Sequence, residues 1–258
     1  MKISVRSWNL QLPMYEGIMK AGQMGFDGIA LWYAEGFVQL QEVQQDDGKA
    51  ILDACEEAGL EISALTGGLG SFRDPEHRPV AVQKTRDELA ACEILGIPRI
   101  TSHVGVMPEN MEEENAVGMR DALKEVGEEA AEKGLVLACE TGPEDAQTMY
   151  DFIAECDTDG LAINYDPANF HLRGYEWLEG VEIFGPLIDH THAKDAKKQP
   201  DGEVVQTPLG EGDIDFRKWI DALSDVGFDG WLCIERETGE DRLREIEEGL
   251  RFLRGLME

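Results

Sequence analysis

The chain has 258 residues, 42% of them hydrophobic, which is enough for one domain with a full core. No uncharged apolar run reaches the roughly 18 residues of a membrane span, so we expect a soluble, cytoplasmic protein that does not enter a membrane. The 53 acidic and 23 basic residues give a net charge of −30, which repels nucleic-acid phosphates and excludes nucleic acid as a partner.

Short apolar runs rich in β-branched residues alternate with longer amphipathic stretches along the chain, as in repeated βα units around a parallel sheet. The predicted strands are Ile3–Trp8, Gly28–Tyr33, Glu61–Thr66, Arg99–His103, Leu135–Glu140, Leu161–Tyr165, Leu187–Ala193 and Trp231–Glu235. The clearest predicted helices are Ala50–Ala58, Val82–Leu95, Ala116–Lys133, Phe216–Val226 and Asp241–Leu256. A long irregular loop is expected after the seventh strand, over Lys197–Asp213, because it contains several Gly and Pro residues.

A glycine followed by an apolar residue recurs where a helix ends and a strand begins. The pairs are Gly25-Phe26, Gly59-Leu60, Gly96-Ile97, Gly134-Leu135 and Gly227-Phe228. Glycine stops a helix in the left-handed conformation, and the apolar residue then packs under the next strand. Eight such units close a (β/α)8 TIM barrel, which we predict over residues 1–258, and an open doubly wound sheet is the alternative.

Two features of composition bear on the surface and the interior. The acidic residues fall mainly on expected helix faces, where they are solvated, and their mutual repulsion predicts a halophilic-type surface adapted to a salt-rich cytoplasm. The five cysteines lie far apart without a C-x-x-C pair, so we expect them to be reduced and buried rather than bound to zinc or paired in disulfides.

The last four predicted strands each end near a residue able to bind a metal ion. These residues are Glu140, Asp166, His192 and Glu235. The strand ends are neighbours on one rim of a closed barrel, where three carboxylates repel one another unless a cation is present. Such a donor set suits Mn²⁺ or Mg²⁺ and tolerates Co²⁺ or Zn²⁺. Taken singly, each acid also fits a solvated loop or a helix cap, and strand alternation does not choose between His190 and His192.

Further candidates stand near the same rim. Trp8 and Trp32 end the first two predicted strands, where they either wall a substrate pocket or cap the barrel core. His103 ends the fourth strand and has either a substrate-binding or a packing role. Lys194 and Lys198 belong to a basic cluster that either attracts substrate or is a solvated loop.

The chain resembles the sugar phosphate isomerase/epimerase family, which has a xylose-isomerase-like TIM barrel. The resemblance rests on AGQMGFDGIALW at 21–32, NYDPAN, HTHAKDAK, PLGEGDIDF at 208–216 and GFDGWLCIERE. It implies that one divalent cation binds Glu140, Asp166, His192 and Glu235, with the second histidine of the HxH motif as the ligand. Ketose 3-epimerases of the group typically carry a histidine and an arginine where this chain has Asn169 and Lys198, side chains that are still able to bind substrate hydroxyls.

The resemblance also implies a function: metal-dependent isomerisation or epimerisation of a small sugar-like substrate, with or without phosphate. The metal would stabilise an enediolate, and Glu140 and Glu235 would exchange the proton as base and acid. The alternatives are a keto-inositol-type dehydratase on the same scaffold and a non-catalytic sugar-binding barrel. A homo-oligomer is compatible with each.

Overall fold

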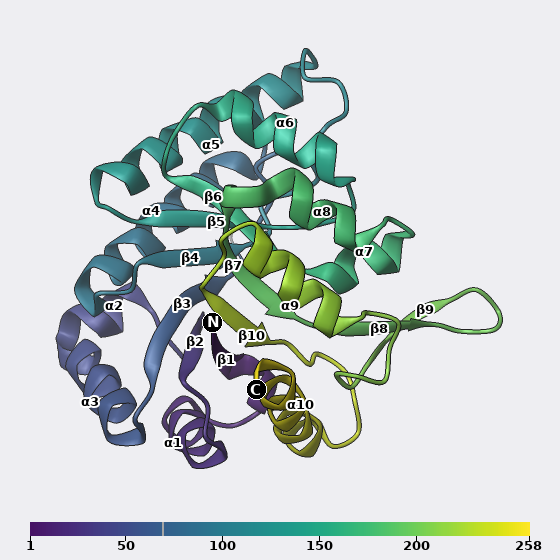
Figure 1. Cartoon of the computed structure of the whole chain (residues 1–258). Helices are drawn as coiled ribbons and strands as arrows, with labels where there is room; N and C mark the ends of the chain where they lie inside the picture. Colours follow the sequence, from purple (N-terminus) through teal and green to yellow (C-terminus); the bar gives the residue numbers. More distant parts are fainter. Residues whose placement is uncertain (69) are drawn as a thin grey trace.

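A closed barrel of eight parallel strands forms the centre of the protein, in the order β1-β10-β7-β6-β5-β4-β3-β2. The computed structural model describes residues 1–68 and 70–258, except for the side chains of residues 45 and 46. Helices surround the barrel (Figure 1). The predicted (β/α)8 TIM barrel is therefore confirmed.

The barrel strands agree with the predicted ranges to within two residues at every end. They are β1 (Lys2–Arg6), β2 (Gly28–Tyr33), β3 (Glu61–Gly67), β4 (Arg99–Ser102), β5 (Val136–Glu140), β6 (Leu161–Tyr165), β7 (Ile188–Ala193) and β10 (Trp231–Ile234). The largest difference is at Trp8, which lies not in β1 but in the following 3-10 helix η1 (Ser7–Leu10). The backbone turns here because Gln11, directly after η1, adopts a left-handed conformation with φ of 55°.

The recurring glycines end helices as predicted, each with φ between 66° and 88°. In every case the N–H of the following apolar residue donates to the carbonyl five residues earlier, as Phe26 does to Ala21 and Leu60 to Cys55. This is the hydrogen bond of a Schellman cap, which satisfies a carbonyl at the helix end. The helices concerned are α1 (Met14–Met24), α3 (Gly48–Ala58), α4 (Arg78–Leu95), α5 (Glu114–Glu132) and α9 (Phe216–Asp225).

The remaining elements include α10, which the sequence pattern predicted as Asp241–Leu256, and several that it did not list. They are α2 (Leu40–Glu42), η2 (Val43–Asp47), α6 (Ala146–Cys156), α7 (Pro167–Arg173), α8 (Trp177–Phe184), η3 (Gly185–Leu187), β8 (Asp195–Lys198), β9 (Val204–Thr207) and α10 (Arg242–Met257). The expectation of an irregular loop over Lys197–Asp213 was wrong in part, because β8 and β9 pair as an antiparallel hairpin that projects from the barrel (Figure 1). Val204 and Val205 are β-branched and favour the extended backbone of β9, and the Gly and Pro residues lie in the turns on either side of this strand.

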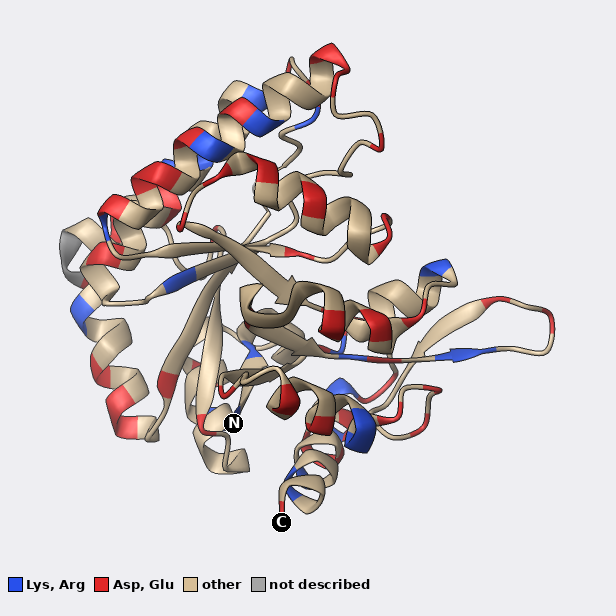
Figure 2. Cartoon of the chain, turned by 45° about the horizontal axis from the view of Figure 1, so that its top comes forward, with Lys and Arg blue, Asp and Glu red and all other residues tan. Residues whose placement is uncertain are grey.

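The cysteines lie in the core and the acidic residues lie mainly on the outer helices. All five cysteines are buried and free, as predicted. Asp and Glu residues are frequent on the outer helices, whereas most of the barrel strands carry none (Figure 2). In the described part of the chain, no helix is both long and apolar enough to span a membrane.

Candidate metal centre

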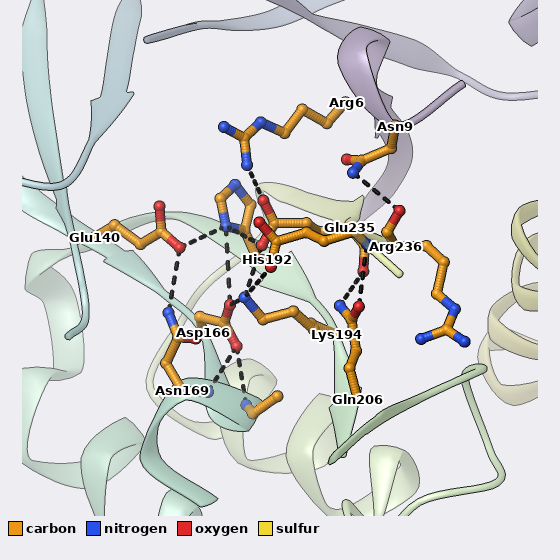
Figure 3. A network of polar contacts seen from close by, with 12 residues as sticks. Arg6, Asn9, Glu140, Asp166, Asn169, His192, Lys194, Gln206, Glu235 and Arg236 are labelled. Atoms are coloured by element: carbon orange, nitrogen blue, oxygen red, sulfur yellow. Dashed lines mark hydrogen bonds and ion pairs between the residues drawn. The ribbon is translucent and has the colours of Figure 1, made fainter. Parts of the chain in front are cut away.

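Four side chains from neighbouring strands converge at the carboxyl end of the barrel. Glu140 is the last residue of β5, Asp166 directly follows β6, His192 lies in β7 and Glu235 directly follows β10. These strands are adjacent in the barrel order, so their ends share one part of the rim. A possible ligand atom from each residue lies within 4.8 Å of the others, and the four side chains face one another in Figure 3.

The imidazole of His192 stands among the three carboxylates. Its Nδ1 lies 3.2 Å from Glu140 Oε1, 3.4 Å from Glu235 Oε2 and 4.0 Å from Asp166 Oδ2. All four residues are at most 7% exposed, so water does little to relieve the repulsion of the carboxylates. Three carboxylate donors and one nitrogen in this volume fit a single divalent cation.

Asp166 combines the two roles that the sequence left as alternatives. Its Oδ1 accepts the backbone N–H groups of Ala168, at 2.9 Å, and Asn169, at 3.1 Å, and thereby caps α7. Its Oδ2 points to the cluster, where it faces His192 and the ammonium group of Lys194. A helix cap therefore positions the oxygen that is available to a metal ion.

Two cations offset part of the negative charge. Lys194 Nζ lies 2.7 Å from Asp166 Oδ2 and 2.8 Å from Glu235 Oε2, while Arg6 donates from Nη1 to Glu235 Oε1 (Figure 3). Lys194, predicted as a substrate-binding residue, thus contacts two of the expected metal ligands directly. Arg6 was missed by sequence reasoning, although a lone charge at the end of an apolar strand is a signal that a buried acid faces it.

The carboxyl groups differ in their protonation equilibria. Burial opposes ionisation of Glu140, but His103 and His192 outweigh it and hold the pKa at about 2. For Glu235, burial is again outweighed, here by Lys194, His192 and Arg6, and the pKa lies well below its usual value. Burial raises the pKa of Asp166 to about 6, with further upward contributions from Glu235 and Glu140, although Lys194 lowers it. The two glutamates are therefore ionised at neutral pH.

The second histidine of β7, His190, lies beside the cluster as a buried support. Its Nδ1 is 2.9 Å from Asn164 Oδ1, and Asn164 Nδ2 in turn lies 3.3 Å from His192 Nε2. The two imidazole rings meet edge to face, with centroids 5.8 Å apart. The structure thus separates the two histidines that strand alternation alone left equivalent, and Asn164 orients both.

Two predicted substrate-binding residues adjoin Glu140. His103 Nε2 lies 3.4 Å from Glu140 Oε1, and the His103 side chain is 59% exposed. Asn169 Nδ2 donates to the same oxygen at 3.2 Å and to the carbonyl of Thr141 at 2.9 Å. Both residues line a cavity of about 350 Å³, which gives a small molecule access to this edge of the cluster.

The other three predicted substrate-binding positions are distributed differently. The Trp8 and Trp32 rings lie 6.1 Å apart, and the Arg6 guanidinium is 4.5 Å from the Trp32 ring. Because Arg6 also donates to Glu235, it links the two rings to that carboxylate. Lys198 is exposed on the hairpin, about 13 Å of extended chain beyond Lys194, and its backbone N–H donates to Asp213. The structure therefore does not bring Lys198 to the cluster.

Asp195 explains why the HxHxKD and LGEGxID segments occur together. Its carboxylate accepts the backbone N–H groups of Ala196, Gly210 and Gly212 at 2.9 Å and of Ile214 at 3.3 Å. A Cβ at position 212 would lie 2.0 Å from Asp195 Oδ1, so only glycine fits there. The second segment thus folds around the aspartate of the first, next to Lys194.

The fold and the donor set together define a TIM barrel with a buried metal-type centre at the carboxyl ends of its later strands. Among such barrels, the family model described as xylose isomerase-like TIM barrel matches residues 18–256. The chain belongs to this family.

Several curated proteins are similar in sequence. The uncharacterized protein MJ1311 of Methanocaldococcus jannaschii is 25% identical over 182 residues, 66% of this chain and 61% of that protein. A putative hydroxypyruvate isomerase of Streptomyces coelicolor is 22% identical over 249 residues, which cover 90% of this chain and 88% of that protein. An inosose dehydratase of Geobacillus thermodenitrificans is 27% identical over 135 residues, 45% of either protein.

Solved structures share the fold. A xylose isomerase domain protein from Planctomyces limnophilus has a TM-score of 0.83 at 23% identity, covering 92% of this chain and 90% of its own. The IOLI protein, solved with a bound zinc atom, has a TM-score of 0.82 at 18% identity, covering 99% and 98%. The probable 3-DHS dehydratase AsbF from Bacillus anthracis has a TM-score of 0.79 at 19% identity, covering 98% and 99%. At these identities the likeness shows the fold alone.

Proposed function

We propose that this protein is a divalent-metal-dependent isomerase or epimerase of a small sugar or sugar phosphate. The observation that carries the proposal is the buried convergence of Glu140, Asp166, His192 and Glu235 within 4.8 Å. The putative hydroxypyruvate isomerase and a ketose 3-epimerase of Arthrobacter globiformis, 25% identical over 234 residues, support this chemistry. The zinc atom in the IOLI structure supports a metal ion, and the donor types favour Mn²⁺ or Mg²⁺ and tolerate Co²⁺ or Zn²⁺.

The four residues would hold the metal, which when bound supplies Lewis-acid stabilisation of negative charge on the carbonyl and hydroxyl oxygens of the substrate. Glu140 is ionised and accepts a proton from the carbon beside the carbonyl. Glu140 ends β5 and Glu235 directly follows β10, and β6 and β7 lie between these two strands in the barrel, so the two carboxylates reach the site from different directions. In an isomerisation, Glu140 returns the proton that it has accepted to the adjacent carbon; in an epimerisation, Glu235 first takes up a proton from water and then donates it to the opposite face.

The remaining site residues bind and orient the substrate in this proposal. His103 and Asn169 reach the cavity beside Glu140 and hold substrate hydroxyls there. Trp8 and Trp32 form an apolar wall, with Arg6 fixed between them and Glu235. Lys194 contacts the Asp166 and Glu235 carboxylates and offsets part of their charge.

A dehydratase of a keto-inositol-type substrate is the second candidate. The match to inosose dehydratases favours it, although that alignment covers about half of either chain. The same deprotonation of carbon leads to elimination if the neighbouring hydroxyl leaves as water. A non-catalytic sugar-binding barrel has no need of a complete donor set, and the presence of all four residues argues against it.

The deciding experiment is incubation of the Mn²⁺-loaded protein with a panel of ketoses, ketose phosphates and inososes in deuterated water, followed by NMR. We expect an isomer or epimer with deuterium at the carbon that lost its proton. A product lacking one water assigns the dehydratase instead. Binding of a sugar without conversion of any panel member, on protein with a full complement of metal, would assign a binding barrel.

A further inference from the structure

A second cavity, of about 410 Å³, lies beyond Trp32 and is bordered by the end of β2, the start of α2 and the helix α4. We call it the α4 pocket. The side chains that line it include Trp32, Tyr33, Gln39, Gln41, Lys84 and Glu88. None of the last four belongs to the metal centre, so the pocket has its own set of polar groups.

Glu88 is the unusual member of this set. Its side chain is buried, with the residue 1% exposed, and Oε2 has no hydrogen-bond partner in the described part of the chain. Lys84 precedes it by one helical turn, the spacing at which such pairs usually meet. Lys84 Nζ instead lies 3.4 Å from the carbonyl oxygen of Gly68, and no hydrogen bond or ion pair joins it to Glu88 within the described residues. An acid and a base thus border the same cavity without a direct contact between them.

The residues around Glu88 leave room for its carboxyl group, although burying this group lowers the stability of the fold. A Cβ at position 67 would lie 2.4 Å from Glu88 Oε1, so Gly67 leaves the room that the carboxyl group occupies against β3. The next turns of α4 are apolar, with Leu89 and Cys92 fully buried, and an apolar residue at position 88 would pack there without desolvating a polar group. Packing alone therefore does not account for a carboxyl group at this position.

The free groups match a ligand with many hydroxyls. The Tyr33 hydroxyl accepts the N–H of Leu40 at 3.2 Å, and its proton is available for donation. Gln39 and Gln41 each add a donor and an acceptor, and the rings of Trp32 and Tyr33 add apolar walls. Most of these groups are neutral donors and acceptors, and the one cation, Lys84, is exposed to solvent, so the described lining favours a neutral molecule over an ion. We propose that the α4 pocket binds a small polyol or sugar at a site separate from the metal centre.

The pocket has a physical connection to the metal centre through Trp32. The Arg6 guanidinium lies 4.5 Å from the Trp32 ring and donates to Glu235. A molecule in the α4 pocket therefore contacts Trp32, and Trp32 in turn contacts Arg6, which donates to the Glu235 carboxylate of the metal centre. Occupancy changes the environment of an indole, which makes tryptophan fluorescence a direct readout of binding.

The test is titration of xylitol and myo-inositol into metal-free protein, followed by saturation-transfer NMR and tryptophan fluorescence. The parent and a His192→Ala protein are compared, because the latter lacks a metal ligand but keeps the α4 pocket. We expect equal binding to both, a loss of affinity of at least about tenfold in Lys84→Met and Glu88→Leu, and no change in the control Lys218→Met, whose lysine is also exposed. Glu88→Leu should also melt at a higher temperature than the parent when no polyol is present.

Two results would overturn the proposal. One is the absence of binding to the parent at tens of millimolar polyol. The other is binding that Lys84→Met retains and His192→Ala loses, which would place the ligand at the metal centre. Because Lys84 is exposed, its variant remains informative even if Glu88→Leu does not fold. Failure of the proposed isomerase activity is a separate result, since it is measured as turnover by the metal-loaded protein.

Discussion

Lys194 Nζ lies 2.7 Å from Asp166 Oδ2, whereas the nearest nitrogen of His192 lies 4.0 Å from the same oxygen. The ammonium group also contacts Glu235 Oε2 at 2.8 Å. A lysine thus makes close contacts with two oxygens that a metal ion would need. The lysine and the metal ion are expected to compete for these oxygens.

Replacing Lys194 with Met should therefore strengthen Mn²⁺ binding, by roughly tenfold, which corresponds to about 1.4 kcal/mol. Calorimetric titration measures the change. Lys198→Met is the matched control, because its exposed side chain lies on the hairpin outside the cluster. Weaker binding in Lys194→Met would show instead that the ammonium group supports the site by holding its ligands in place.

The four-residue cluster should bind one divalent metal per chain. Asp166→Asn and His192→Ala each remove one donor and should lower the affinity for Mn²⁺, while His77→Ala, which alters an exposed histidine, should not. Elemental analysis after dialysis gives the stoichiometry, and titration gives the affinity. Unaltered Mn²⁺ binding in both cluster variants would place the metal elsewhere.

Glu140→Gln and Glu235→Gln should each lower turnover by about 10²–10⁴-fold, because an amide keeps the shape of the side chain but cannot accept the proton. Deuterium incorporation into the product should fall in parallel. Metal content has to be measured beside activity, since both residues are also expected ligands. Full activity of both variants on a confirmed substrate would refute the proton-transfer roles.

Glu88 should make stability depend on pH. Burial raises its pKa to about 8, above the ordinary value of 4.5, so the folded chain binds more protons than the unfolded chain between these pH values. Its stabilising contribution is thus fully present below about pH 4.5 and is lost as the pH rises through 8, with a slope of up to about 1.4 kcal/mol per pH unit. Urea unfolding across this range should give a flatter curve for Glu88→Gln than for the parent. Parallel curves would contradict the assignment.

Salt should stabilise the protein well beyond the range in which ordinary surface ion pairs respond, because screening relieves repulsion in a chain of net charge −30. Melting temperatures in KCl, from low to molar concentration, test this. A flat or falling curve would remove the prediction of a halophilic-type surface and leave the proposed activity untouched.

The sequence predicted those features that depend on local pattern or on barrel symmetry. The eight strands and the rim position of Glu140 and Asp166 follow from periodicity and strand ends. The arrangement around Glu88 did not follow, because the burial of this helical residue depends on the space that Gly67 leaves at the end of β3. Arg6 was missed for a similar reason, since its partner Glu235 lies 229 residues away in the sequence.

The four amide hydrogen bonds to Asp195 join the two ends of the β8–β9 hairpin to each other, directly after β7. The turn between Lys198 and Val204 lies beyond this anchor and has no part in holding His192 or Lys194 in place. Insertions and deletions at the turn are therefore tolerated without displacing those two side chains. The length of this turn can therefore vary among related proteins while the metal-type cluster on the rim stays constant.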